Sequence, residues 1–242
     1  MLAYISFYRK NRVPLACYGS CIMRPRIIVF ASGTKDGGGS GFENLVKSPD
    51  LDADIVAVVS NHERGGVHAR AEKLGVPFIF FPGPFDAEHY SGVLQRTGID
   101  AKDVWLALSG WLKKVEGLNP AKTFNIHPAL LSAQNRRFGG TGLYGHHVHE
   151  AVKHALDEAE ITESGVTMHF VTPIYDEGPI FFEYRIPLRK DMSADDIALL
   201  VNAAEHQWQP KMTNLVVHGE ISWNGRDASS LIVPKGYIYL PK

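Results

Sequence analysis

Residues 26–41 (RIIVFASGTKDGGGSG) decide the fold that this sequence predicts. The run from Ile27 to Ala31 is apolar throughout, as expected of a parallel strand buried on both faces. A glycine-rich loop, Gly33 to Gly41, follows the run, and a helix is expected to begin near Phe42. A strand that enters a helix through such a loop is typical of the first unit of an α/β sheet.

The same alternation of strand and helix continues along the chain. Apolar runs at residues 55–59, 78–81, 104–108 and 124–126 predict four more strands, with helices expected at 68–74 and 86–95. This order predicts a Rossmann-like α/β fold with a mostly parallel central sheet and helices on both faces. Ligands bind such sheets beyond the carboxyl ends of the strands, where Ser32-Gly33, Ser60-Asn61, Ser109-Gly110 and His127 are expected.

The pattern changes after Pro128. Residues 134–142 are polar and rich in glycine, which favours a mobile loop. A helix is expected at 145–159, strands at 166–172 and 180–188, and a further helix with Ser193 as its N-cap. Residues 221–240 are expected to form short strands and turns. The absence of repeats and linkers indicates one domain, residues 23–242.

Composition excludes several classes of function. The 242 residues include 25 basic and 26 acidic side chains, so the chain has no polyanion-binding footprint, and we expect no nucleic-acid partner. No apolar run reaches the ~20 residues that span a bilayer, so we expect no membrane association. Residues 1–22 hold both cysteines, Cys17 and Cys21, and lack the pattern of a secretory signal. We interpret them as a disordered extension or a start assigned too far upstream, and we expect a cytoplasmic protein.

An amide, an imidazole and a carboxylate supply the most informative chemistry. Asn125 and His127 are two residues apart, so an extended segment presents both side chains on one face. Both can donate hydrogen bonds to a developing oxyanion in acyl transfer. Asp176, in the run Asp176-Glu177-Gly178, could raise the pKa of the imidazole and orient it. The simpler alternative is that both segments are turns with satisfied polar groups.

The glycine-rich loop is a candidate phosphate site, because backbone N–H groups at a helix N-terminus attract anions. It lacks the ending of a Walker loop and the spacing of a dinucleotide fingerprint, so an ordinary flexible loop is the alternative. In a helix, the three residues His146, His147 and His149 do not all lie on one face, because they occupy consecutive and i+2 positions. They also form no H-E-x-x-H motif. We therefore expect no metal site and interpret these histidines as surface or loop-lining residues.

The chain from residue 23 to about 239 resembles the folate-dependent formyltransferases, and within them the phosphoribosylglycinamide formyltransferase family. The motifs occur in family order: Ser32-Gly33 with Gly39-Ser40-Gly41, Ser60-Asn61, Ser109-Gly110-Trp111, the Asn-Ile-His-Pro of residues 125–128, His169-Phe170-Val171, Asp176-Glu177-Gly178-Pro179, and Glu205-His206. The paired Asn-Ile-His-Pro and Asp-x-Gly-Pro motifs are the most specific.

The resemblance implies the formyltransferase fold and formyl transfer from 10-formyltetrahydrofolate, as co-substrate, to the amine of glycinamide ribonucleotide. It implies that Asn125 is the oxyanion donor, that His127 is the general acid and that Asp176 tunes it. The substrate phosphate and ribose would bind Gly39, Ser40, Gly41 and Glu205, and folate would bind Leu112, Lys113, Lys114, Val115 and Asn125. The protein would be a monomer or homodimer.

The sequence departs from the family pattern at several positions. The glycine-rich loop carries extra residues at about 35–38, and Gly41 replaces the usual asparagine. Three alternatives stay open: a sugar-nucleotide N-formyltransferase, a formyltetrahydrofolate deformylase, and a binding domain with a degenerate site.

Overall fold

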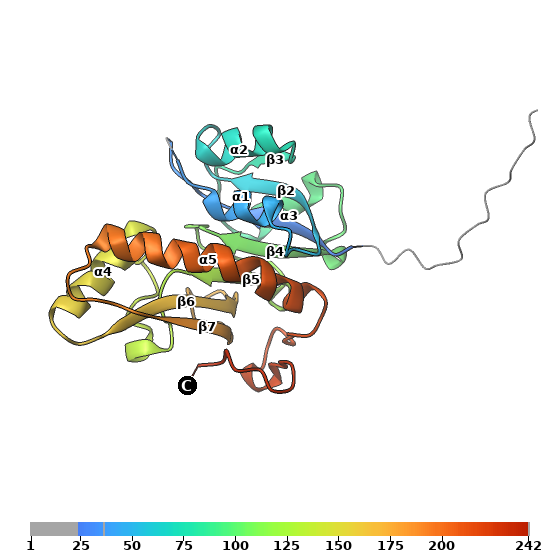
Figure 1. Cartoon of the computed structure of the whole chain (residues 1–242). Helices are drawn as coiled ribbons and strands as arrows, with labels where there is room; N and C mark the ends of the chain where they lie inside the picture. The colour runs from blue at the N-terminus through green and yellow to red at the C-terminus, as the bar shows by residue number, and fades with distance from the viewer. Residues whose placement is uncertain (1–23, 36, 242) are drawn as a thin grey trace, which may run out of the picture.

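A seven-stranded sheet forms the centre of the protein (Figure 1). The computed structural model describes residues 24–35 and 37–241, so the predicted extension at 1–22, with Cys17 and Cys21, lies outside the described residues. The strand order is β3-β2-β1-β4-β5-β6-β7. The strands are β1 Arg26–Phe30, β2 Asp54–Ser60, β3 Phe78–Phe80, β4 Val104–Ser109, β5 Thr123–His127, β6 Glu163–Phe170 and β7 Ile180–Pro187.

Strands β1 to β5 are parallel, which confirms the mostly parallel sheet. Strand β6 runs antiparallel to β5, and β7 runs antiparallel to β6. The chain builds outward in one direction from β1 to β3 and in the other from β4, so the order reverses between β1 and β4. Loops that leave two such strands diverge and open a crevice beyond their carboxyl ends.

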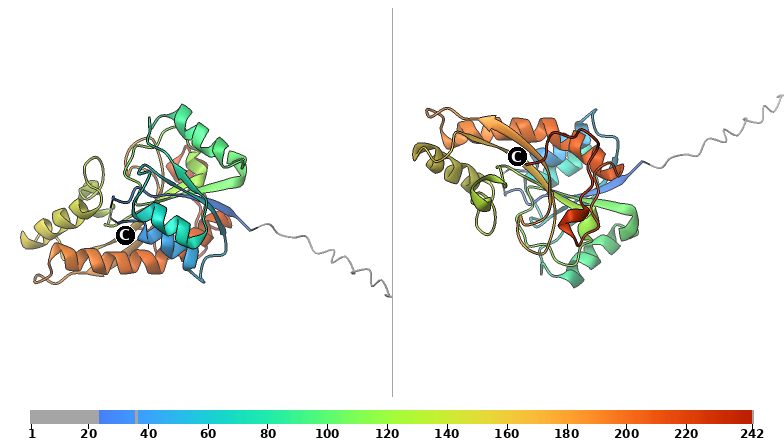
Figure 2. Two further views of the ribbon diagram at one scale, coloured as in Figure 1. Left: turned by 90° about the horizontal axis from the view of Figure 1, so that it is seen from above. Right: turned by 90° about the horizontal axis from the view of Figure 1, so that it is seen from below.

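Helices cover both faces of the sheet, as predicted (Figure 2). Alternate residues of β1 point to opposite faces: Ile27 and Val29 join the core under α1, α2, α4 and α5, whereas Ile28 and Phe30 join the core under α3. The helices are α1 Ser40–Lys47, α2 Gly66–Leu74, α3 Ala87–Arg96, α4 His146–Asp157 and α5 Ala194–Val217.

Helix α5 begins where the sequence predicts. The Ser193 hydroxyl accepts a hydrogen bond from the Asp196 N–H at 3.1 Å, and the Asp196 carboxylate accepts one from the Ser193 N–H at 2.9 Å. This reciprocal capping box satisfies two backbone donors at the helix start and fixes the direction of a 24-residue helix. That helix brings Glu205 to the crevice.

The C-terminal segment differs from the prediction of short strands. Within residues 221–240 the structure has one isolated bridge, between Ser222 and Ile232, and a short 3-10 turn at Ala228–Ser230. The segment instead covers the free edge of the sheet, where the Tyr239 carbonyl accepts the Glu183 N–H of β7 at 2.7 Å. One such contact protects an edge strand without extending the sheet.

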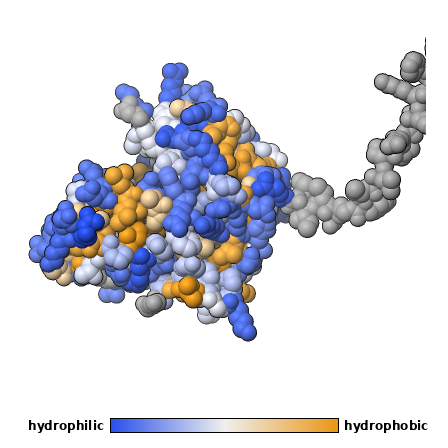
Figure 3. All heavy atoms as spheres, viewed as in Figure 1, coloured by the Kyte–Doolittle hydropathy of each residue, from blue (hydrophilic) through white to orange (hydrophobic). Residues whose placement is uncertain are grey.

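The face shown in Figure 3 is mainly polar, with apolar side chains in several groups, one of them over the end of the molecule where α4 and α5 lie. Leu199 of α5 is 73% exposed and Tyr144, just before α4, is 47% exposed. Both line the crevice described below. In the described part of the chain, no helix combines the length and apolar character needed to cross a membrane.

Candidate active site

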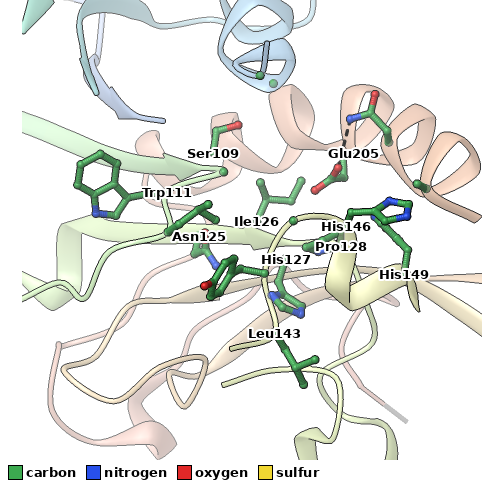
Figure 4. A pocket seen from close by; sticks show the side chains of 18 of the residues that line it. Ser109, Trp111, Asn125, Ile126, His127, Pro128, Leu143, His146, His149 and Glu205 are labelled. Carbon is green, nitrogen blue, oxygen red and sulfur yellow. Dashed lines mark hydrogen bonds between the residues drawn. The ribbon is translucent and has the colours of Figure 1, made fainter. Parts of the chain in front are cut away.

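A cavity of about 760 Å³ opens beyond the carboxyl ends of β1, β4 and β5. Its size lies within the range of small-molecule sites. The glycine-rich loop and the start of α1 form one wall, α5 forms another, and residues 140–146 form a third. Figure 4 shows Asn125, His127 and Ser109 with Glu205 around this space. The predicted strand ends at Ser109-Gly110 and His127 therefore meet at one cavity.

The start of α1 faces the cavity with backbone N–H groups. Gly39 adopts a left-handed conformation (φ 81°) before the first helical residue, Ser40, and no side chain caps the helix. Arg70 of α2 holds the loop: its Nη1 donates to the Gly38 carbonyl at 2.8 Å, and its Nε donates to Glu43 Oε2 at 2.7 Å. The free N–H groups and the helix dipole together favour an anion here.

Asn125, His127 and Asp176 converge on the opposite side of the cavity through a fourth residue, His169. The Asn125 amide nitrogen lies 3.2 Å from His169 Nε2, which lies 3.4 Å from Asp176 Oδ1. His127 Nδ1 lies 3.9 Å from Asp176 Oδ2. Antiparallel pairing places His169 directly opposite Asn125. Asp176 is thus held between two imidazoles.

The pKa of His127 is lowered overall, although Asp176 raises it as expected, because burial has the larger effect. The side chain is 4% exposed, and the loss of hydration disfavours the charged imidazole. The Asp176 charge opposes this effect but does not overcome it. The Nε2 atom donates to the Phe138 carbonyl at 2.7 Å, so the loop at residues 132–142 covers the imidazole.

Asp176 is held in place by its backbone and its carboxylate. Its φ of 54° is a left-handed conformation that aspartate tolerates better than most residues. The carboxylate accepts the Gly140 N–H at 2.7 Å, and two histidines face it, so its pKa lies far below its usual range despite burial. Close packing fixes the segment, because a Cβ on Gly178 would lie 1.6 Å from the Phe170 carbonyl oxygen.

Glu205 projects from α5 into the cavity wall opposite the catalytic candidates (Figure 4). Burial raises the pKa of its carboxyl group to about 7. Asn202, one turn earlier, donates to Oε2 at 3.4 Å, a contact too weak to offset the loss of hydration. Ligand groups that donate hydrogen bonds would stabilise the charged form of this buried carboxyl group.

A second cavity of about 50 Å³ adjoins the first and includes Lys113, Lys114 and Val115 in its lining. Leu112 lines the larger cavity instead, so the structure divides the predicted folate-binding segment. Two of its backbone groups already have partners: the Leu112 N–H donates to Ser32 Oγ at 3.0 Å, and the Lys114 carbonyl accepts the Tyr90 hydroxyl at 2.7 Å. Asn125 and Asp176 line both cavities.

Comparison with known proteins identifies the family. A formyl transferase family model matches residues 25–213. The chain belongs to the formyl transferase family. It is 32% identical over 214 residues to the chloroplastic phosphoribosylglycinamide formyltransferase of Arabidopsis thaliana, covering 83% of this chain and 68% of that one. The Bacillus subtilis phosphoribosylglycinamide formyltransferase is 28% identical over 197 residues, covering 77% of this chain and 92% of that one.

Solved structures agree with these sequence relatives. Glycinamide ribonucleotide transformylase 1 from Symbiobacterium toebii superposes with a TM-score of 0.69 at 26% identity, covering 88% of this chain and 95% of that one. The phosphoribosylglycinamide formyltransferase from Anaplasma phagocytophilum gives a TM-score of 0.69 at 26% identity, covering 90% and 98%. The predicted fold class and family are confirmed.

In this formyl transferase, sequence reasoning missed two cavity histidines. His169 was part of a recognised motif but had no assigned role, because only the β5–β6 register places it beside Asn125. The interpretation of His149 as a surface or loop-lining residue is wrong, because this residue of α4 is buried in the cavity wall. Burial lowers the pKa of its imidazole to about 4. It shares a helical face with His146, three residues earlier, with ring centroids 6.3 Å apart.

The structure gives no candidate metal centre in the formyl transferase domain. Across residues 24–35 and 37–241, no three His, Cys, Asp or Glu side chains are grouped so that they could share a metal ion. His146 contacts carboxylates instead, with Nε2 3.6 Å from Asp195 and 3.9 Å from Glu150. The cavity lining offers hydrogen-bond donors, imidazoles and carboxylates.

Proposed function

We propose that this protein transfers the formyl group of 10-formyltetrahydrofolate to the amine of 5-phosphoribosylglycinamide, a step of purine biosynthesis. The observation that carries the proposal is the position of Asn125 and Asp176 in the walls of both cavities, with His127 adjacent. Reacting groups at a junction of two cavities suit a reaction that joins two substrates. The named relatives support the choice of acceptor.

The neutral amine attacks the formyl carbon, forming a C–N bond and placing negative charge on the formyl oxygen. The Asn125 amide is positioned to donate to this oxyanion, a contribution of about 10²–10³ in rate for one such donor. The C–N10 bond of the folate then breaks, and the proton lost by the amine is delivered to N10. No covalent intermediate with the protein is required, because the amine attacks the formyl carbon directly.

His127 acts as a hydrogen-bond donor and proton carrier in this scheme. Its Nε2–H is engaged by the Phe138 carbonyl at 2.7 Å, so this bond must open before Nε2 can donate to substrate. Nδ1 faces the Asp176 carboxylate, which stabilises the imidazolium whenever a proton is held there. Because burial lowers the pKa of His127, the imidazolium is a strong acid that gives up its proton readily.

The substrates are assigned to opposite ends of the site. We place the phosphate of the acceptor at Gly39, Ser40 and Gly41, where α1 presents free N–H groups. Glu205 accepts hydrogen bonds from the ribose hydroxyls. The folate lies toward the segment from Leu112 to Val115, which lines the cavities on the other side of Asn125.

The cellular compartment and the assembly state belong to the proposal as well. A cytoplasmic protein, monomeric or homodimeric and without nucleic-acid or membrane partners, stays our prediction. The two plant relatives with 32% identity are chloroplastic proteins, and this chain spans 68% and 66% of their lengths. Fractionation of the source cells distinguishes the cytoplasm from an organelle.

The decisive experiment measures release of tetrahydrofolate from 10-formyltetrahydrofolate, with and without glycinamide ribonucleotide. We expect release that requires the ribonucleotide and is lost in Asp176→Asn. Release without any acceptor would instead assign a deformylase. Release only with an amino-sugar nucleotide would assign the sugar-nucleotide N-formyltransferase activity, and no release under any condition would contradict formyl transfer.

A further inference from the structure

The acceptor side of the cavity contains a polar pair that the proposed mechanism does not use. Gln209 of α5 is 1% exposed and lies in the cavity lining beside Ser109, the last residue of β4. The Ser109 hydroxyl donates to Gln209 Oε1 at 3.4 Å. Gln209 Nε2 is enclosed and has no hydrogen-bond partner among the described residues. An enclosed amide with both N–H groups unused is unfavourable in a folded protein.

Close packing holds this pair against the start of α1. A Cβ on Gly41 would lie 2.2 Å from Ser109 Oγ and 3.3 Å from Gln209 Oε1. Glycine at this position therefore leaves the space that the Ser109 hydroxyl occupies. Figure 4 shows Ser109 at the end of β4, on the side of the cavity where α5 presents Glu205. The hydroxyl lies next to the free N–H groups of α1, where the acceptor phosphate is assigned.

A half-turn of the Gln209 amide exchanges its oxygen and nitrogen. Nε2 then donates to Ser109 Oγ, and the Ser109 hydroxyl no longer has an acceptor within the pair. Its proton is free to donate to an oxygen in the cavity. Both arrangements use the same contact of 3.4 Å. The second gives one amide N–H an acceptor, moves Oε1 to the enclosed position, and presents the hydroxyl to a ligand. A ligand oxygen at this point stabilises the second arrangement.

We propose that Ser109 is a specificity-determining residue that donates to a phosphate or ribose oxygen of the acceptor, and that Gln209 positions its hydroxyl by turning its amide. The inference rests on the proposed function, because that function assigns the phosphorylated acceptor to the start of α1. The pair favours an acceptor with oxygen here over one with an apolar or amino group.

Three variants test the pair. Ser109→Ala removes the donor, Gln209→Glu holds the hydroxyl on a carboxylate and adds a negative charge, and Gln209→Met removes the amide at similar size. Gln207→Met is the matched control, because Gln207 is an exposed residue of the same helix. KM for glycinamide ribonucleotide, KM for 10-formyltetrahydrofolate and the melting temperature without ligands are measured for each.

We expect the acceptor KM to rise about 10-fold in Ser109→Ala, and by more in Gln209→Glu than in Gln209→Met, as for lost bonds to a charged ligand. The KM for the formyl donor and the values for Gln207→Met should stay at the wild-type level. The melting temperature of Gln209→Met should equal or exceed that of the wild type, because an unpartnered donor is removed. The rise in melting temperature on adding the acceptor alone should shrink in all three variants.

Two results would overturn the inference and leave the proposed function intact. The first is an acceptor KM that is unchanged in Ser109→Ala and Gln209→Glu. The second is that these variants change the KM for the acceptor and the KM for the formyl donor equally and melt below the wild type. The second result would assign the pair a purely structural role. A wild-type protein that neither binds nor formylates glycinamide ribonucleotide would overturn both proposals.

Discussion

Replacement of Glu205 by glutamine is expected to stabilise the protein at alkaline pH while weakening acceptor binding. The carboxyl group has one partner, the Asn202 amide at 3.4 Å, and burial raises its pKa from 4.5 to about 7. Because the folded protein binds this proton more tightly than the unfolded chain, ionisation above pH 7 opposes folding. Glutamine keeps the shape and removes the charge.

The magnitude follows from the difference between the two pKa values. A shift of one unit corresponds to about 1.4 kcal/mol, so the shift from 4.5 to about 7 gives a limit of about 3 kcal/mol. Solvent reaches part of this side chain and screens the effect, so about 1–3 kcal/mol is expected at pH 8. The destabilisation vanishes below the unfolded value of 4.5 and is complete above the folded value of about 7.

Thermal unfolding of wild type and Glu205→Gln between pH 5 and pH 8.5 measures this difference. The variant should melt about 3–10 °C above the wild type at pH 8, and the gap should fall to a few degrees or less at pH 5. Glu220→Gln, which removes an exposed charge beyond α5, should give a gap that does not widen with pH. A pH-independent gap in Glu205→Gln, or a variant less stable at pH 8, would refute the reasoning. Its acceptor KM should rise at every pH.

Three further predictions concern the proposed catalytic residues and the proposed phosphate site at the start of α1. His127→Ala should reduce turnover by about 10²–10⁴-fold, and it should lower the melting temperature because the buried Phe138 carbonyl loses its partner; near-normal turnover in the folded variant would remove His127 from the mechanism. Asp176→Asn should abolish most turnover. It should also lower the melting temperature, because the charged carboxylate stabilises the fold above its ordinary pKa of 3.8. The difference in melting temperature between the variant and the wild type should therefore narrow as the pH falls below 3.8. Ser40→Asp should raise the KM for the phosphorylated acceptor through charge repulsion, whereas an unchanged KM would place the phosphate elsewhere.

The sheet and the region of the site follow from sequence because their causes are local. Apolar runs such as residues 27–31 and 104–108 can be buried only as central strands, and the glycine-rich loop marks the carboxyl end of the first. Spacing alone puts Asn125 and His127 on one strand. The crevice is then fixed by the reversal of strand order between β1 and β4, which alternating strands and helices imply.

The features that the sequence does not predict depend on contacts between residues that are far apart in the chain. The partnership of Asn125 and His169 requires the register of two antiparallel strands whose contacting residues are 44 positions apart. The lowered pKa of His127 requires the loop at residues 132–142 to fold over it, although the composition of that loop suggests mobility. Within residues 221–240, the Tyr239 carbonyl accepts the Glu183 N–H of the edge strand, a contact between segments far apart in the sequence.

The position of Asp176 between two imidazoles connects it to Asn125 through His169 as well as to His127 directly. His169 Nδ1 donates to the Phe170 carbonyl at 2.8 Å, and its Nε2 lies 3.2 Å from the Asn125 amide nitrogen. The same Nε2 lies 3.4 Å from Asp176 Oδ1, so the Asn125 amide and the Asp176 carboxylate approach one ring nitrogen. The Asp176 carboxylate therefore reaches both residues that we propose as oxyanion donors: it faces His127 directly, and it shares His169 with Asn125. For this reason the substitution of Asp176 should affect turnover more than the loss of a single hydrogen bond would.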